Sequence, residues 1–155
     1  MTKKLLIVVS LLLIIGGCIF NSKMNQDDDK ERIYLSDKYY NKGEYIGITS
    51  DELSKLGNET YVLFTYNNYC SFSVPCETVF EDFMKKYDID FLSMPFEDFR
   101  NTKLYETIKF GPSVVIVQNG NVIAYLDANE DKDTKRYEDT KEFEKWMNEY
   151  VYFSK

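Results

Sequence analysis

Residues 61–83 read YVLFTYNNYCSFSVPCETVFEDF and join a predicted buried strand to a predicted helix. The strand is 61–66, an unbroken run of mostly aromatic and β-branched residues. After it, apolar residues recur at helical spacing: Val79, Phe80, Phe83, Met84 and Tyr87. Cys70 and Cys76 lie where the strand passes into the helix, and the peptide dipoles of a helix N-terminus lower the pKa of a nearby thiol. This stretch therefore points to redox chemistry.

The two cysteines form a Cys-x5-Cys motif whose geometry depends on Pro75. One continuous helix would separate them by about 9 Å of rise, beyond the limit of about 7 Å between Cα atoms of a disulfide. Proline disfavours helical geometry at the residue before it and is tolerated in a first helical turn, so we expect the helix to begin at Pro75. The loop 70–74 can then bring Cys70 back over Cys76, and a disulfide that closes this short loop is feasible.

The N-terminus has the pattern of an export signal. Lys3 and Lys4 precede the apolar run 5–15, which is shorter than the roughly 20 residues of a membrane span but typical of a signal peptide. The run ends in Gly-Gly-Cys18, which resembles the bacterial lipobox. We therefore expect a lipoprotein signal peptide at 1–17 and a lipid on Cys18. An uncleaved membrane anchor and an ordinary secretory signal are the alternatives, and all three put the remaining chain on the extracytoplasmic face of the cell membrane.

Composition limits the chemistry and the partners. Residues 18–32 are polar and lack periodicity, which predicts a flexible tether, and 33–155 are expected to form one domain. The chain has a net charge of −7 and no histidine. Acidic surfaces disfavour nucleic acid, and the absence of histidine removes histidine-based catalysis and the usual zinc and copper ligands. We expect no nucleic acid, no metal and no organic cofactor. The acidic run Glu130–Asp133 is better interpreted as a solvated loop than as a cation site.

The rest of the domain predicts short strands and amphipathic helices. The expected elements are strands at 33–35 and 45–48, a helix at 51–56 capped by Ser50, a strand at 91–94 ended by Pro95, a helix at 97–108, strands at 114–117 and 122–126, a charged loop at 127–137, and a helix at 138–151. The central strand–helix–strand unit implies a right-handed crossover between parallel strands. Asn119-Gly120 is a strong signal for a type I′ hairpin. The last helix should bury Phe143, Trp146, Met147 and Tyr150.

This order of elements resembles the thioredoxin family over about residues 50–152. In that family the reactive cysteine follows an aromatic residue, as in Tyr69-Cys70, and a cis proline precedes the hairpin, where this chain has Gly111-Pro112-Ser113. The resemblance implies an α/β, thioredoxin-like fold: a mixed central sheet with a βαβ unit and a C-terminal β-hairpin plus helix. It also implies that Cys70 attacks a substrate disulfide and that Cys76 resolves the mixed disulfide that forms. Tyr69, Gly111, Pro112 and Ser113 would shape a groove in which a substrate strand pairs with the backbone.

The chain departs from the family in two respects. The family motif is Cys-x-x-Cys, but the third position after Cys70 is Ser73, which is either the remnant of a monothiol site or, more simply, a turn or helix-capping residue. The family also has a buried acid six residues before its first cysteine, and this position is Phe64. Proton transfer must therefore take another route or be slow.

Two functions remain open. In the first, a membrane-tethered, extracytoplasmic thiol–disulfide oxidoreductase acts on protein thiols and disulfides, with Cys70 and Cys76 exchanging disulfides. In the second, a non-catalytic thioredoxin-like lipoprotein binds an exported protein and its cysteines form a structural disulfide. A disulfide across so short a loop adds little stability, which favours the first. The missing Cys-x-x-Cys motif and buried acid favour the second.

Overall fold

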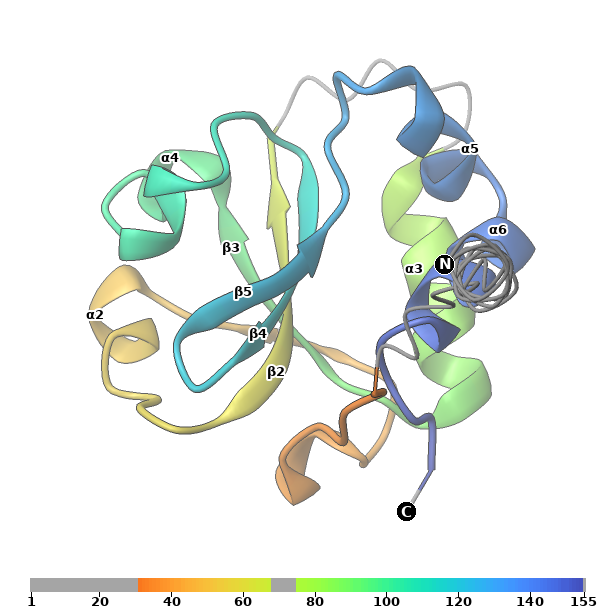
Figure 1. The fold of residues 1–155 in the computed structure, drawn as a ribbon, viewed down its shortest axis with the longest axis horizontal. Coiled ribbons are helices and arrows are strands. Elements are labelled where there is room, and N and C mark those ends of the chain that lie inside the picture. Colours follow the sequence, from red (N-terminus) through yellow and green to blue (C-terminus); the bar gives the residue numbers. More distant parts are fainter. Residues whose placement is uncertain (1–30, 68–74, 155) are drawn as a thin grey trace, which may run out of the picture.

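The computed structural model describes residues 31–67 and 75–154. Its five strands form one sheet in the order β1-β3-β2-β4-β5 (Figure 1). β1, β3 and β2 run parallel, β4 is antiparallel to β2, and β5 is antiparallel to β4. The strands are β1 Tyr45–Gly47, β2 Thr60–Tyr66, β3 Phe91–Pro95, β4 Ser113–Gln118 and β5 Asn121–Tyr125. The helices are η1 Asp37–Tyr39, α2 Ser50–Leu53, α3 Cys76–Tyr87, α4 Phe96–Phe99, η2 Lys103–Glu106, α5 Asp131–Glu138 and α6 Thr140–Asn148, where η marks a 3₁₀ helix.

The helices cover both faces of the sheet. Figure 1 shows α3, α5 and α6 on one face and α2 and α4 on the other. Because β2 lies in the middle of the sheet between these layers, its residues 60–65 are all buried. The unit β2–α3–β3 joins parallel strands through a helix, and the hairpin β4–β5 and the last helix follow it. This topology confirms the predicted fold class, a mixed α/β, thioredoxin-like fold.

An aromatic cluster fills the space between the sheet and the helices α3 and α6. The ring of Phe80 lies 4.6 Å from that of Phe143 and 5.2 Å from that of Phe64 in β2. Phe83 meets Phe143 edge to face at 5.1 Å. All four side chains are buried, so the middle of α3 is held against the sheet by large aromatic side chains.

Several local predictions are confirmed. Asn119 and Gly120 both have positive φ, 52° and 74°, as a type I′ turn requires. Asp88 ends α3 in the left-handed conformation. The helix begins at Cys76 with Pro75 as its N-cap, one residue later than expected. Of the four residues predicted to be buried on the last helix, Phe143, Trp146 and Met147 are buried.

Two predicted segments are wrong. The expected charged loop at 127–137 contains helix α5, because Asp133 and Tyr137, one helical turn apart, both turn inward and are buried. Asp133 accepts a hydrogen bond from the backbone N–H of Asp127 at 3.1 Å, which fixes the start of the helix. The expected helix at 97–108 is broken into α4 and η2, because Thr102 is extended and its hydroxyl donates to the carbonyl of Phe99 at 2.8 Å.

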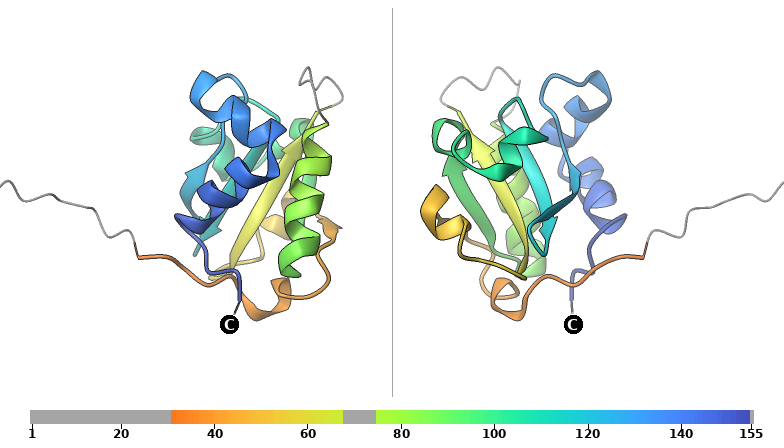
Figure 2. Two further views of the ribbon diagram at one scale, coloured as in Figure 1. Left: turned by 90° about the vertical axis from the view of Figure 1, so that its right-hand side faces the viewer. Right: turned by 60° about the vertical axis from the view of Figure 1, so that its left-hand side comes forward.

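Other boundaries shift. Thr49, not Ser50, caps α2, and it shares a capping box with Glu52. The last helix begins at Thr140, because Asp139 is extended and its carboxylate caps the first turn. The predicted strand at 33–35 is reduced to one bridge between Ile33 and Val151, which ties the two ends of the domain together (Figure 2). No helix within 31–67 and 75–154 is long and apolar enough to cross a membrane.

Candidate functional site

The site predicted from the sequence lies at the end of the sheet where β2 finishes and α3 and β4 begin, at the top of Figure 1. Cys18, Tyr69, Cys70 and Ser73 lie outside the described residues. The last described residue of the first segment, Asn67, donates its side-chain amide to the carbonyl of Gly111 at 2.6 Å. Asn67 therefore lies beside the Gly-Pro loop.

The loop before β4 is built by Gly111, Pro112 and Ser113. The Gly111–Pro112 peptide bond is cis. Ser113 is buried and its hydroxyl donates to the carbonyl of Phe110 at 2.6 Å, which closes the loop. A methyl group on Gly111 would come within 2.5 Å of the ring of Phe96, so only glycine allows this close approach. The resemblance implied a cis proline at this place, and the backbone has one.

Cys76 is the first residue of α3 and is fully buried. Its thiol donates to the side-chain Oε2 of Glu77, with 3.7 Å between sulfur and oxygen. The hydroxyl of Tyr45 in β1 donates to the backbone carbonyl of Glu77 at 3.3 Å. Burial raises the pKa of Tyr45, and the neighbouring acids and Cys76 raise it further. The first turn of α3 is therefore fixed to the sheet next to the sulfur.

Tyr137 of α5 anchors the proline loop. Its hydroxyl lies 2.9 Å from the carbonyl oxygens of both Pro112 and Leu126, and the side chain is fully buried. Burial raises the pKa of Tyr137 well above its ordinary value, and the nearby Cys76 adds to the shift. Tyr137 thus contacts the proline loop directly, and negative charge on Cys76 would raise the pKa of its phenol further.

The position of the family's buried acid is apolar here. Phe64 is buried in β2 and packs against Phe80 of α3 and against Tyr45, with 5.6 Å between the rings of Phe64 and Tyr45. Within 31–67 and 75–154, no three potential ligand side chains gather in a way that could hold a metal ion. The arrangement offers a thiol, a carboxylate and two phenols beside a cis-proline loop, which is a set suited to proton and thiol chemistry.

Sequence reasoning found Cys76 and the Gly111–Ser113 loop but missed Asn67, Glu77 and Tyr137 as members of this neighbourhood. The spacing of Asp133 and Tyr137 in the charged segment was the available signal for Tyr137, because it places both on one face of a helix. Glu77 carried no signal beyond its position next to Cys76. Whether Cys70 and Cys76 pair lies outside the described residues.

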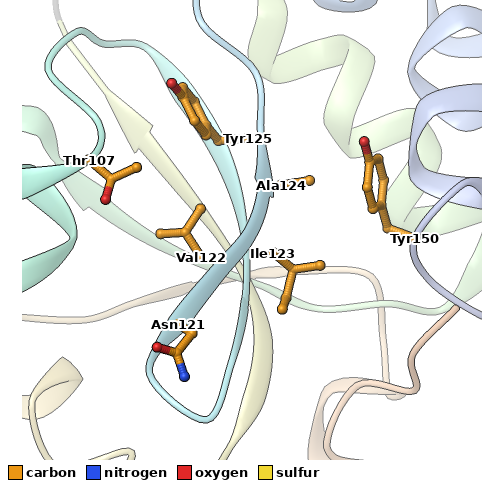
Figure 3. Close-up of a pocket in the computed structure, with 7 residues that line it drawn as sticks. All are labelled: Thr107, Asn121, Val122, Ile123, Ala124, Tyr125 and Tyr150. Carbon is orange, nitrogen blue, oxygen red and sulfur yellow. The ribbon is translucent and has the colours of Figure 1, made fainter. Parts of the chain in front are cut away.

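A separate groove of about 510 Å³ follows the edge strand β5. Figure 3 shows its lining, which comes from residues 121–125, Thr107 and Tyr150. These side chains are apolar, amide, hydroxyl or phenol groups. The groove therefore contains none of the thiols or carboxylates of the Cys76 neighbourhood.

Known proteins resemble the chain in structure. No protein-family model matches it, and no curated protein matches it in sequence. Thioredoxin f from spinach chloroplast (long form) is 14% identical over 76% of this chain and 94% of its own, with a TM-score of 0.49. Thioredoxin from Schistosoma mansoni is 16% identical over 70% of this chain and 97% of its own, with a TM-score of 0.48. Thioredoxin f2, solved in complex with ferredoxin:thioredoxin reductase, is 20% identical over 68% of this chain and 96% of its own, with a TM-score of 0.45. At these identities and TM-scores the likeness indicates nothing about the activity of this chain. The topology of its own sheet defines the mixed α/β, thioredoxin-like fold.

Proposed function

We propose that the protein is a membrane-tethered thiol–disulfide oxidoreductase that acts on protein thiols and disulfides outside the cytoplasm. The observation that carries the proposal is the buried thiol of Cys76 at the start of α3, at the end of the sheet where the cis Gly111–Pro112 loop leads into β4. The hydrogen bond from Asn67 to Gly111 supports it, because Asn67 lies three residues before Cys70 in the sequence and contacts the same loop.

In this proposal Cys70 supplies the attacking thiolate and Cys76 the resolving thiol. Attack forms a bond between the sulfur of Cys70 and one substrate sulfur, and the other substrate sulfur leaves as a thiol. Cys76 then attacks the sulfur of Cys70, which forms the protein disulfide and releases the second substrate thiol. Two electrons pass from the protein to the substrate, and the reverse steps oxidise a substrate dithiol.

The substrate is proposed to bind as an extended strand beside Tyr69, Gly111, Pro112 and Ser113. Extended peptides pair with exposed backbone and are selected by the pockets beside it. Phe110, next to this loop, exposes 53% of its surface and supplies an apolar contact at the rim. This environment suits unfolded or partly folded protein chains, which present extended apolar segments.

The location follows from the sequence pattern at the N-terminus. A lipid on Cys18 would hold the domain at the extracytoplasmic face of the membrane, and 18–32 would serve as the tether. A Cys18→Ser chain expressed in a bacterium should lose metabolically incorporated lipid, while a Cys76→Ser chain should keep it. Equal labelling of both chains would contradict the lipid anchor.

The buried Phe64 favours a second candidate, a non-catalytic binding or accessory lipoprotein for an exported protein. An apolar ring at this position gives the site no internal acid on the sheet. In that case the cysteines form a structural disulfide and the loop serves only to bind.

Trapping of a covalent intermediate separates the two candidates. Full-length chains with Cys18→Ser are incubated with a fluorescent, disulfide-linked peptide. In a chain that also carries Cys76→Ser, the mixed disulfide between Cys70 and the peptide has no resolving thiol. It should accumulate as a fluorescent protein band that dithiothreitol removes. With Cys70→Ser added instead, the buried Cys76 should give little adduct. If neither chain forms an adduct, or both form it at the same rate, the oxidoreductase is excluded in favour of the binding module.

A further inference from the structure

We propose that Glu77 is a catalytic residue whose side-chain carboxylate exchanges a proton with the thiol of Cys76. The inference rests on the proposed function and names the proton acceptor of the same site. A resolving thiol must lose its proton before it can attack, because the thiolate is the nucleophile.

The geometry gives the proton a short route. The sulfur of Cys76 is fully buried, and its hydrogen bond runs to Oε2 of Glu77 at 3.7 Å. Glu77 itself is only half-buried. One side chain therefore contacts the enclosed sulfur and also reaches the surface, so a proton can pass from sulfur to carboxylate and on to water.

The backbone around Glu77 is fixed for this contact. The hydroxyl of Tyr45 donates to the backbone carbonyl of Glu77, which anchors the first turn of α3 to β1. Thr78 donates its backbone N–H to the carbonyl of Pro75 at 3.0 Å within the same turn. The carboxylate is thus presented by a rigid element, as acid–base catalysis requires.

Among the described residues, the other titratable groups that interact with Cys76 or with its neighbouring tyrosines are poorly suited to accept the proton. Tyr45 and Tyr137 influence Cys76 electrostatically, but burial raises the pKa of each phenol, so both stay protonated at neutral pH. Glu81 lies one turn further along α3, and its charge raises the pKa of Tyr45. Asp127 and Asp133 raise the pKa of Tyr137, and the carboxylate of Asp133 is paired with Arg136.

The proton transfer from Cys76 to Glu77 accompanies the formation of the protein disulfide. The proton of the Cys76 thiol passes to Glu77, and the Cys76 sulfur attacks Cys70 in the mixed disulfide. The bond between Cys70 and the substrate sulfur breaks, the Cys70–Cys76 bond forms, and the departing substrate thiolate takes up one proton. In the reverse direction Glu77 returns the proton to Cys76.

The equilibrium test measures the ionisation of Cys76 without any exchange. Thiolate absorbance is titrated in full-length chains that carry Cys18→Ser and Cys70→Ser, with a matching Cys76→Ser chain to subtract the tyrosine signal. An adjacent carboxylate and its hydrogen bond both favour the protonated thiol. Glu77→Gln should therefore lower the titration midpoint by about one pH unit. Glu81→Gln, which removes the same charge one turn away, should lower it by clearly less.

The kinetic test follows resolution itself. Chains with Cys18→Ser and both Cys70 and Cys76 are mixed with 5,5′-dithiobis(2-nitrobenzoate), and the second release of the coloured thiolate reports the attack of Cys76. If Glu77 takes the proton, no net proton leaves the site and the rate should vary less than about threefold over the neutral range. In Glu77→Gln the rate should fall tenfold for each pH unit below the thiol midpoint, and Glu81→Gln should retain the flat profile.

The outcomes are distinct. An unchanged midpoint and an unchanged pH–rate profile in Glu77→Gln would overturn the role of Glu77. Release of the second thiolate that also occurs with Cys76→Ser, or that never occurs, would overturn the exchange proposed for the cysteine pair. In that case the equilibrium titration alone decides whether Glu77 and Cys76 share a proton.

Discussion

The hydroxyl oxygen of Tyr137 lies 2.9 Å from the carbonyl oxygen of Pro112 and the same distance from that of Leu126. This contact joins helix α5 to both ends of the hairpin, because Pro112 precedes β4 and Leu126 follows β5. The helix, the hairpin and the proline loop are therefore held together by one buried phenol beside Cys76.

Tyr137→Phe should lower the free energy of unfolding by about 1–3 kcal/mol, since it removes the single hydroxyl proton that the carbonyl oxygens of Pro112 and Leu126 share. Urea unfolding followed by circular dichroism measures the loss. Tyr125→Phe makes the same change on β5, where 36% of the side chain is exposed, and should stay within about 0.5 kcal/mol of the wild type. Equal stability of the two variants would contradict the role assigned to Tyr137.

Gly111→Ala should lower the free energy of unfolding by about 1–3 kcal/mol, because the added methyl group would lie 2.5 Å from the ring of Phe96 in a packed region. Gly47→Ala is the matched control: a methyl group there has no atom within 4 Å, and the change should be neutral or stabilising. The same denaturant titration measures both. A stable Gly111→Ala chain would show that the loop can move away from Phe96 without cost.

Stability should fall at low pH through Glu144, which joins α6 to the end of α3. Hydrogen bonds from Lys86 at 2.6 Å and Tyr87 at 2.5 Å hold the pKa of Glu144 below its usual value. A carboxylate with a lowered folded-state pKa stabilises the protein above its unfolded-state pKa, and this stabilisation is lost as the pH falls through the folded-state pKa.

Glu144→Gln should therefore lower the free energy of unfolding by about 0.2–1 kcal/mol at pH 7, as expected for a pair at the surface, and should have no effect once the wild-type carboxyl is protonated. The measurement is the free energy of unfolding of both chains from pH 7 downward. Glu149→Gln removes an equal charge from an exposed neighbouring position and corrects for net charge. A difference between wild type and Glu144→Gln that stays constant across the pH range would contradict the pairing.

Much of the fold could be predicted because local signals agreed with the tertiary structure. The unbroken apolar run at 61–66, the helical spacing after Pro75 and the Asn119-Gly120 turn each define one element without outside help. Helix α5 could not be predicted in this way, because its residues are mostly charged. It is stabilised by burial of Tyr137 and by the contacts of Asp133 with the backbone of Asp127 and with Arg136. The break at Thr102 likewise depends on a side-chain hydrogen bond that competes with a helix.

Some residues of the candidate site could be predicted from the sequence and others could not. Cys76 and Pro112 stand out by residue type, since cysteine and proline have chemistry or geometry that other residues lack. Glu77 is one of many acidic residues on the chain, and only its contact with the sulfur distinguishes it. The sequence indicated that the proton route must differ from the family's, but it could not name the residue.

A glutathione redox titration tests the central claim most directly. The full-length chain with Cys18→Ser is equilibrated at defined potentials, and the thiols of Cys70 and Cys76 are counted by mass spectrometry. The oxidoreductase account predicts a reversible transition between about −120 and −270 mV. A bond that stays closed well below about −300 mV, or thiols that never pair, would contradict it and leave a binding module on a thioredoxin-like fold.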